Sequence, residues 1–241
     1  MKAVILSIYP QVKMVDITHG IEKFDIRNGA FMLASVAPYF PKATIHLAVV
    51  DPGVGTTRRP IAIETEKSKF VGPDNGLMIM AAEEQKILRV HEITNTQFTL
   101  PNISRTFHGR DIFAPVAAHV AKGAKINHLG PKIADFIKPS FSTVSREGHN
   151  IIGEIIHVDG FGNIITNIRP QKIDNDYIQI SFGSKHLDVK VSSTYADGIS
   201  KEPIILMGSH GFLEIALNQG SAAKKFNVKI GKKIVLANLN N

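Results

Sequence analysis

Residues 50–60 read Val50-Asp51-Pro52-Gly53-Val54-Gly55-Thr56-Thr57-Arg58-Arg59-Pro60 and place a carboxylate, two glycines and two arginines directly after an apolar run. That run, residues 45–50, is typical of a strand buried on both faces of a sheet. Asp51 is then expected at the carboxyl end of the strand, where open α/β sheets bind ligands. An Asp-Pro-Gly tripeptide on its own is more often a simple turn. The polar clusters that follow it favour a site.

Strand and helix patterns alternate through the first half of the chain. Small and apolar residues at helical spacing predict a helix over residues 26–39, ended by prolines. Residues 2–9 fit a helix or a strand. The remaining predictions are strands at residues 13–19, 60–65, 69–71 and 87–93 and a helix at residues 77–84. This alternation predicts an N-terminal α/β/α domain with a mostly parallel sheet.

The pattern changes after Pro131. Residues 136–150 contain proline, glycine and four Ser or Thr residues, which is typical of a linker. Beyond them, helical periodicity is scarce, and short strands are predicted at residues 151–158, 177–182, 186–191, 204–207 and 228–236. The second domain is therefore expected to be an antiparallel β-sheet or a small β-barrel. The predicted domains are residues 1–140 and residues 150–241.

Composition excludes several classes of protein. The 241 residues carry a formal net charge of +7, but the lysines are scattered rather than gathered in a basic stripe with aromatic residues, so nucleic-acid binding is not favoured. Cysteine is absent, which excludes a disulfide and a thiolate metal site, and the histidine spacing fits no common metal motif. No signal peptide or membrane-spanning segment is predicted. We expect a cytoplasmic protein without a metal or a cofactor and without a membrane partner.

Two polar clusters in the first half of the chain point to the chemistry. His108 is expected just ahead of a helix capped by Asp111, where the helix dipole lowers the pKa of a histidine. Asp51, Arg58 and His108 come from loops that are expected to share one sheet edge. The carboxylate can accept a proton from water or orient it, while the arginine and the histidine stabilise developing hydroxide. This set suits a reaction in which water is the nucleophile.

The second half of the chain has polar clusters of its own. Asp159-Gly160-Phe161-Gly162-Asn163 is a glycine-rich hairpin tip whose carboxylate and amide can bind a ribose or an amide edge, or form only a turn. Glu214 stands in an apolar stretch, where a structural role is favoured because charged residues are rarely buried unpaired. Motifs for a phosphate loop, a dinucleotide site and a serine nucleophile are absent from the sequence.

Together these motifs resemble the S-adenosylmethionine (SAM) hydroxide adenosyltransferases, the adenosine-forming SAM hydrolases, which are related to fluorinating and chlorinating enzymes. The resemblance runs from Met1 to the last predicted strand. It rests on six motifs in the same order: VDITH at residues 15–19, VDPGVG at 50–55, GPDNG at 72–76, FHGRD at 107–111, DGFGN at 159–163, and LEIA at 213–216 with Asn218.

The resemblance implies a reaction and a set of residues. Water or hydroxide attacks C5′ of SAM, methionine leaves as a neutral thioether, and Asp51, Arg58 and His108 form the water-activating triad. A homotrimer is also implied, with SAM held between the first domain of one subunit and the second domain of its neighbour. The implied substrate-binding residues are Asp51, Asn75, Asp159, Phe161 as a stacking wall, Asn163, Ser209, Glu214 and the backbone of Leu217.

One difference from the family pattern concerns the start of the chain. Family members usually begin with a strand and a loop whose aspartate holds the ribose hydroxyls, whereas Met1 and Lys2 align with the helix that follows. This alignment predicts a helix over residues 2–9, and either a start placed at an internal methionine or a truncated, weak enzyme. The rival functions are a non-catalytic adenosine- or SAM-binding protein and, less favoured, a SAM-dependent halogenase, in which Asp51 would repel the halide.

Overall fold

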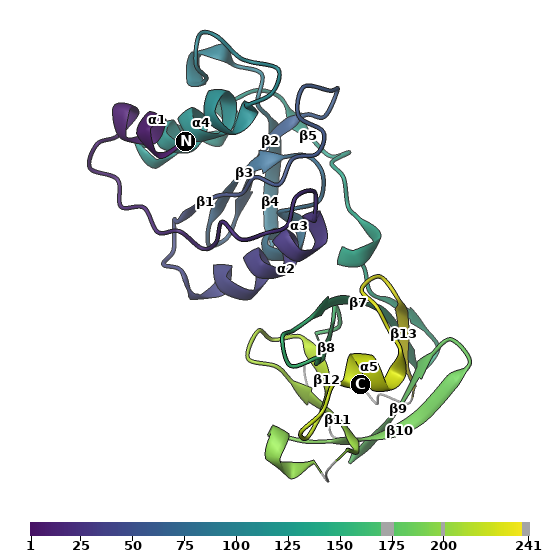
Figure 1. The fold of residues 1–241 in the computed structure, drawn as a ribbon. Coiled ribbons are helices and arrows are strands. Elements are labelled where there is room, and N and C mark those ends of the chain that lie inside the picture. Colours follow the sequence, from purple (N-terminus) through teal and green to yellow (C-terminus); the bar gives the residue numbers. More distant parts are fainter. Residues whose placement is uncertain (170–175, 199–200, 238–241) are drawn as a thin grey trace. The chain divides into compact units, whose positions relative to one another are not determined.

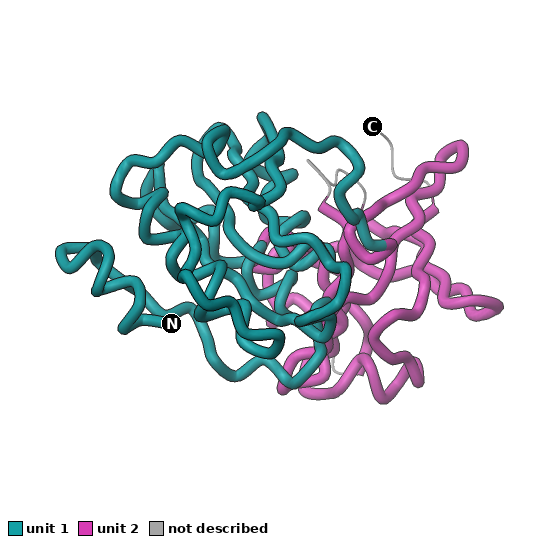
Figure 2. The backbone as a smooth tube through the Cα atoms, turned by 90° about the horizontal axis from the view of Figure 1, so that it is seen from above, with its two compact units in different colours: residues 1–139 teal, residues 140–241 magenta. Residues whose placement is uncertain are grey.

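The computed structural model describes residues 1–169, 176–198 and 201–237. The chain forms two compact units, residues 1–139 and residues 140–241, which Figure 2 distinguishes by colour. Each unit has its own sheet and its own hydrophobic core. The boundary falls within the segment of residues 136–150, where the sequence pattern changes.

Unit 1 has three layers, with a sheet between two pairs of helices. The sheet order is β1-β3-β2-β4-β5, with β1 Ile45–Leu47, β2 Pro60–Thr65, β3 Lys69–Pro73, β4 Ile87–Glu92 and β5 Lys132–Ile133. The α-helices are α1 Lys2–Ile8, α2 Ile26–Val36, α3 Ile79–Glu84 and α4 Ala114–Ala121. Helix α1 packs with α4 and helix α2 packs with α3, and Figure 1 shows the two pairs on opposite faces of the sheet.

Strands β2 and β3 at the centre of this sheet are apolar on both faces because helices cover both sides. Ala62 and Val71 lie in one core cluster with Phe113 and Val116 from the α4 side. Phe70, the neighbour of Val71 in β3, is fully buried as well. The strands are therefore a rigid floor for the loops that leave them.

The strand directions correct one expectation. A mostly parallel sheet was predicted, but among the described residues of unit 1 only the β1–β3 pair is parallel, and β2–β3, β2–β4 and β4–β5 are antiparallel. Only residues 66–68 separate β2 from β3, and so short a connection makes a hairpin, because a parallel pair needs a long crossover. The sheet is therefore mixed, within the α/β class that was expected.

Two predictions near the N-terminus have opposite outcomes. The helix expected over residues 2–9 is confirmed as α1. The strand expected over residues 13–19 is wrong, because the segment has no strand partner in the part of unit 1 that the structure describes. Val15 is 70% exposed there, so the alternating apolar pattern is not buried against a sheet.

Unit 2 is a β-barrel. Seven of the described strands form a ring in the order β13-β9-β10-β11-β12-β8-β7, which the β13–β7 pairing closes, and β6 pairs with the first residues of β7. The bounds are β6 Ser145–Glu147, β7 Asn150–Val158, β8 Ile164–Thr166, β9 Tyr177–Phe182, β10 Lys185–Val191, β11 Pro203–Met207, β12 Leu213–Leu217 and β13 Lys233–Ala237, and helix α5 is Ala222–Phe226. The pairings are antiparallel apart from β10–β11. This confirms the predicted antiparallel sheet or barrel.

His46 in β1 makes the stability of unit 1 dependent on pH. His46 is 4% exposed, its ring stacks on Phe70 at a centroid distance of 4.8 Å, and its Nε2 makes no hydrogen bond within the described residues. Burial lowers the pKa of His46 to about 4. The unfolded chain, with a histidine pKa of about 6.5, binds the proton first, so stability that is complete above pH 6.5 falls as the pH drops towards 4.

The expected loss from His46 is about 3 kcal/mol between pH 7 and pH 4. Denaturant unfolding at these two pH values, in wild type and in His46→Leu, measures it. The variant should show the smaller drop, because the titration of other groups is common to both proteins. Equal pH dependence in the two proteins would contradict this role of His46.

Candidate active site

The candidate site begins where β1 ends. The backbone N–H of Ala48 still donates to Val71 O at 3.1 Å, so the chain runs beside β3 beyond the end of the strand. The carbonyl of Val50 then accepts a hydrogen bond from Asn75 Nδ2 at 2.8 Å. Asp51 is therefore placed by a rigid strand and by a side-chain contact to the residue before it.

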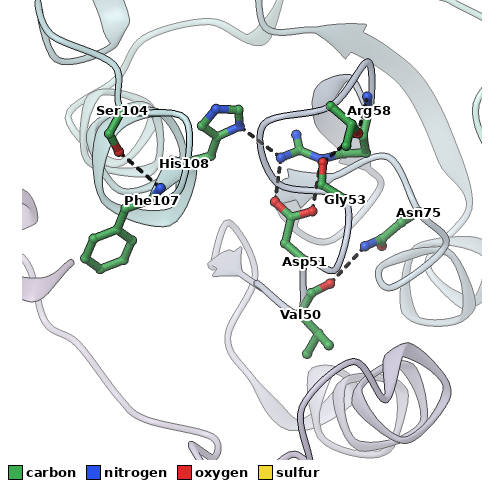
Figure 3. A network of polar contacts seen from close by, with 9 residues as sticks. Val50, Asp51, Gly53, Arg58, Asn75, Ser104, Phe107 and His108 are labelled. Carbon is green, nitrogen blue, oxygen red and sulfur yellow. Dashed lines mark hydrogen bonds and ion pairs between the residues drawn. The ribbon is translucent and has the colours of Figure 1, made fainter.

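Asp51 and Arg58 form a buried, two-pronged ion pair. Arg58 Nε donates to Asp51 Oδ1 at 3.1 Å, and Arg58 Nη2 donates to Asp51 Oδ2 at 2.5 Å (Figure 3). Only 6% of the Asp51 side chain and 7% of the Arg58 side chain are exposed. A planar guanidinium matches a carboxylate in this arrangement, which fixes the orientation of both groups.

His108 joins this pair from a second loop. Arg58 Nη2 lies 3.0 Å from His108 Nδ1, and because a guanidinium can only donate, Nδ1 accepts and the ring proton of the neutral histidine is on Nε2. Burial, and then the positive charge of Arg58, lower the pKa of His108. The three residues predicted as a water-activating set thus lie together, as Figure 3 shows.

Close contact between the two loops depends on Gly55. Its φ is +76°, a conformation that favours glycine, and a Cβ there would lie 2.3 Å from the carbonyl oxygen of Arg105. Residues 104–107 lead directly to His108. The glycine signal in the sequence therefore has a structural reason, which is the approach of one loop to the other.

Asp111 has a different place from the one predicted. It does not cap a helix, because it lies inside a five-residue π-helix, Gly109–Phe113, which precedes α4 and follows His108. Its fully buried carboxylate accepts from Arg110 Nε at 2.6 Å and from the backbone N–H of Ser104 at 2.8 Å, and these hydrogen bonds, that of Arg110 first, hold its pKa far below the usual range. Asp111 thus ties the start of the loop to the helix that carries His108.

Arg58 has a donor group that the described residues leave unused. Arg58 Nη1 is buried and makes no hydrogen bond among the described residues, and the guanidinium lies over the Phe113 ring at 5.2 Å. Asp51 also lines a cleft of about 360 Å³ in unit 1, together with residues 47–50, 17–19 and 21–24. A small nucleophile beside Asp51 would have a carboxylate, a guanidinium and an imidazole within one site.

Asn75 was predicted as a substrate contact, and the structure places it beneath the Asp51 loop. Its Nδ2 donates to Val50 O, and its Oδ1 accepts from the backbone N–H of Leu77 at 3.2 Å. Both ends of the amide therefore have protein partners. Its contact with substrate stays a prediction.

Asp159, Phe161 and Asn163 form a compact turn in unit 2. Asp159 Oδ1 accepts from the backbone N–H groups of Phe161 and Asn163, each at 2.9 Å, and Oδ2 accepts from Asn163 Nδ2 at 3.0 Å. The Phe161 ring is 83% exposed. A groove in unit 2 is lined by these three residues and by Tyr195, Leu217 and Ser221.

Glu214 has partners that the sequence did not reveal. Its carboxylate, in β12, accepts from the Tyr195 hydroxyl at 2.8 Å and lies 3.4 Å from His210 Nε2, and 4% of the side chain is exposed. Burial, and the hydrogen bond to Glu214, raise the pKa of Tyr195 to about 12. Ser209 is exposed in the turn between β11 and β12. Tyr195 is a lining residue that sequence reasoning missed, because it lies in a 3₁₀ turn, Tyr195–Asp197, outside the quoted motifs.

Two further features of the described residues concern metal binding and membranes. Among those residues, no group of three or more His, Asp or Glu side chains is placed to hold a metal ion. No described helix has the length and apolar character that crossing a membrane requires.

Comparison with known proteins identifies the family of this chain. The model of the SAM hydroxide adenosyltransferase N-terminal domain matches residues 1–130, and that of the C-terminal domain matches residues 153–235. The chain belongs to the SAM hydroxide adenosyltransferase family. The expected family is thereby confirmed, and the matched ranges include every candidate residue named above.

Individual relatives extend over nearly the whole chain. The (R)-S-adenosyl-L-methionine hydrolase of Salinispora tropica is 36% identical over 96% of this chain and 88% of its own length. The enzyme of the same name from Thermus thermophilus is 34% identical over 98% and 92%. A crystal structure of an uncharacterized conserved protein from Thermotoga maritima has a TM-score of 0.83 at 37% identity, covering 98% of this chain and 93% of that one. More distant relatives, at 26–28% identity, are named fluorinases.

The lowered pKa of His108 predicts the acid limb of the pH profile of this site. Protonation of Nδ1 would break its hydrogen bond with Arg58 and place two positive charges side by side. Because the pKa lies below the usual 6.5, activity should stay level through neutral pH and fall only below that value. A profile of kcat/KM from pH 4.5 to 9, repeated with His108→Gln, measures this. An acid limb centred above pH 6.5 would contradict the geometry.

Proposed function

We propose that this protein hydrolyses SAM to adenosine and L-methionine. The observation that carries the proposal is the buried set of Asp51, Arg58 and His108, in a chain whose family and relatives are associated with this reaction. The relatives' name specifies the (R) form, so we propose the epimer with (R) configuration at sulfur as the substrate.

In the proposed mechanism, a water molecule beside Asp51 attacks C5′ of SAM as the bond from C5′ to sulfur breaks. The sulfur takes both electrons of that bond and methionine leaves as a neutral thioether, so no acid is needed for the leaving group. Asp51 orients the water and accepts its proton as the new C–O bond forms. Arg58 Nη1 and His108 Nε2–H are the donors available to the oxygen while it has hydroxide character.

The remaining features of the proposal concern cofactors and the assembly of subunits. Each chain would need no cofactor or metal, because the substrate is itself the activated sulfonium. The protein would be a cytoplasmic homotrimer, with the groove around Phe161 and Tyr195 contributing to a neighbouring subunit's site. Sedimentation equilibrium with and without SAM tests this assembly, and a monomer under both conditions would exclude it.

Two other functions remain as rivals. A binding protein would bind adenosine or SAM without turnover. A halogenase would require a halide beside Asp51, where two negative charges in a buried site repel each other strongly. The Asp51 carboxylate, which can accept a proton from water and repels an anion, therefore favours water over a halide as the nucleophile.

The test is an incubation of the purified protein with each sulfonium epimer of SAM, followed by chromatography of adenosine and methionine. Equal release of both products, faster from the (R) epimer and unchanged by added chloride, supports the proposal. Tight adenosine binding without methionine release would favour the binding protein. A chloride-dependent halogenated nucleoside would favour the halogenase.

A further inference from the structure

A second ion pair is formed by Arg59, the residue that follows Arg58. Arg59, the neighbour of Arg58, directs its side chain to Asp74 rather than to Asp51, with Nε and Nη2 at 3.2 and 2.8 Å from Asp74 Oδ2. The side chain of Asp74 is 3% exposed and that of Arg59 is 25% exposed. The backbone N–H of Asp74 also donates to Arg59 O at 2.9 Å.

These contacts form a closed ring with the candidate catalytic pair. Asp74 is followed by Asn75, whose side chain holds Val50 O, and Val50 is followed by Asp51. Asp51 holds Arg58, and Arg58 is followed by Arg59. The ring thus consists of three side-chain contacts joined by three peptide bonds. A shift at Asp74 therefore changes the position of both ends of the loop that carries Asp51 and Arg58.

The segment at the end of unit 1 is attached to the same ring. Asp74 Oδ1 accepts from the backbone N–H of Ile137 at 2.8 Å, and Arg59 binds the side chain and the carbonyl of Asp135 at 3.0 and 2.8 Å. Gly76, with φ of +91°, faces Pro139, which a Cβ would approach to 2.5 Å. This segment leads directly into unit 2, which begins at Ser140.

We propose that Asp74 and Arg59 are positioning residues that set the geometry of the Asp51–Arg58 pair and tie it to residues 135–139. The proposal rests on the proposed function for its kinetic consequences. Neither residue touches the reacting atoms, and both act through Asn75 and through the loop. A displacement of the Asp51–Arg58 pair lowers kcat more than it weakens substrate binding, because only the transition state requires the full alignment.

The first test is Asp74→Asn, which keeps the shape and the acceptor for Ile137 but removes the charge that holds Arg59. We expect kcat to fall about 100-fold with KM changed less than about 3-fold. Arg59→Gln should give the same pattern, and Arg59→Lys a smaller loss. The matched control is Glu64→Gln, which removes an ion pair with Arg89 in the same sheet, outside the ring, and should leave kcat within about 2-fold.

A second measurement does not depend on turnover. Hydrogen exchange of the backbone amides in residues 51–58 should accelerate in Asp74→Asn and remain unchanged in Glu64→Gln. If wild type releases no methionine, the proposed function fails, yet this exchange comparison still decides the positioning role. If Asp74→Asn does not fold, Asn75→Ala interrupts the same ring and should show the same exchange. Unchanged kcat and unchanged exchange would overturn the proposal, as would equal effects from Glu64→Gln.

Discussion

Asp51→Asn is expected to lower kcat for SAM hydrolysis about 10³-fold while adenosine binding changes little. Asparagine has the size of aspartate, but its amide cannot take the proton that the attacking water loses. The buried arginine would also lose the carboxylate that neutralises it, at a cost of about 3 kcal/mol of stability. Single-turnover kinetics, adenosine titration and thermal melting separate these effects.

A matched control for this variant is Asp188→Asn, which makes the same chemical change at an exposed position in β10. It should retain wild-type turnover. Turnover within about 10-fold of wild type in a folded Asp51→Asn protein would be too small a loss for a proton acceptor and would remove Asp51 from the mechanism.

Arg58→Lys is expected to lower kcat about 100-fold despite preserving the charge. A lysine ammonium cannot bind both oxygens of Asp51 and at the same time donate to His108 Nδ1 with the geometry of a guanidinium. It also cannot keep a further donor in the place of Nη1. The acid limb of the pH profile should move as well, because the charge next to His108 moves.

The matched control here is Arg89→Lys, since Arg89 pairs with Glu64 at a partly exposed position. Steady-state kinetics of both variants measure the difference. If Arg58→Lys and Arg89→Lys have the same kcat, the two-pronged contact with Asp51 is not what the reaction requires.

Much of the fold could be predicted from the sequence, because the patterns that indicate it involve residues close together in the chain. The apolar runs at β2 and β4, the helical spacing in α2 and the change of pattern after Pro131 each depend on a few neighbouring residues. The directions of strands depend on which strands become neighbours, and the hairpin between β2 and β3 gave the sheet its mixed character. The apolar alternation of residues 13–19 likewise predicts a strand only where a partner strand is available, and Val15 has none in the described structure.

The candidate catalytic set was predicted for a similar reason. Asp51 and Arg58 lie in one short stretch, residues 50–60, and His108 lies in the motif at residues 107–111, so only two segments had to be brought together. The supporting contacts were not predictable in this way. Arg59 meets Asp74 because the antiparallel pairing of β2 with β3 sets Pro60 opposite Pro73, and the sequence prediction had these strands in a mostly parallel sheet. Tyr195 meets Glu214 only when its 3₁₀ turn lies beside β12.

The roles of two carboxylates also could not be predicted from the sequence alone. Asp111 has the residue type of a helix cap, yet its carboxylate is used by Arg110 and Ser104. Asp159 is bonded within its own turn. In both cases the sequence identified an important carboxylate, and the partner that determines its role was fixed by the three-dimensional packing.

Hydrolysis in water enriched in ¹⁸O identifies the nucleophile and the carbon that it attacks. Attack of solvent water at C5′ places one ¹⁸O atom in the 5′-hydroxyl of adenosine and none in methionine, and mass spectrometry of the two products reads this out. We expect full labelling of the adenosine that wild type releases, and labelled adenosine formed about 10³-fold more slowly by Asp51→Asn. Adenosine released without the label, or the label found in methionine, would contradict the attack of water at C5′.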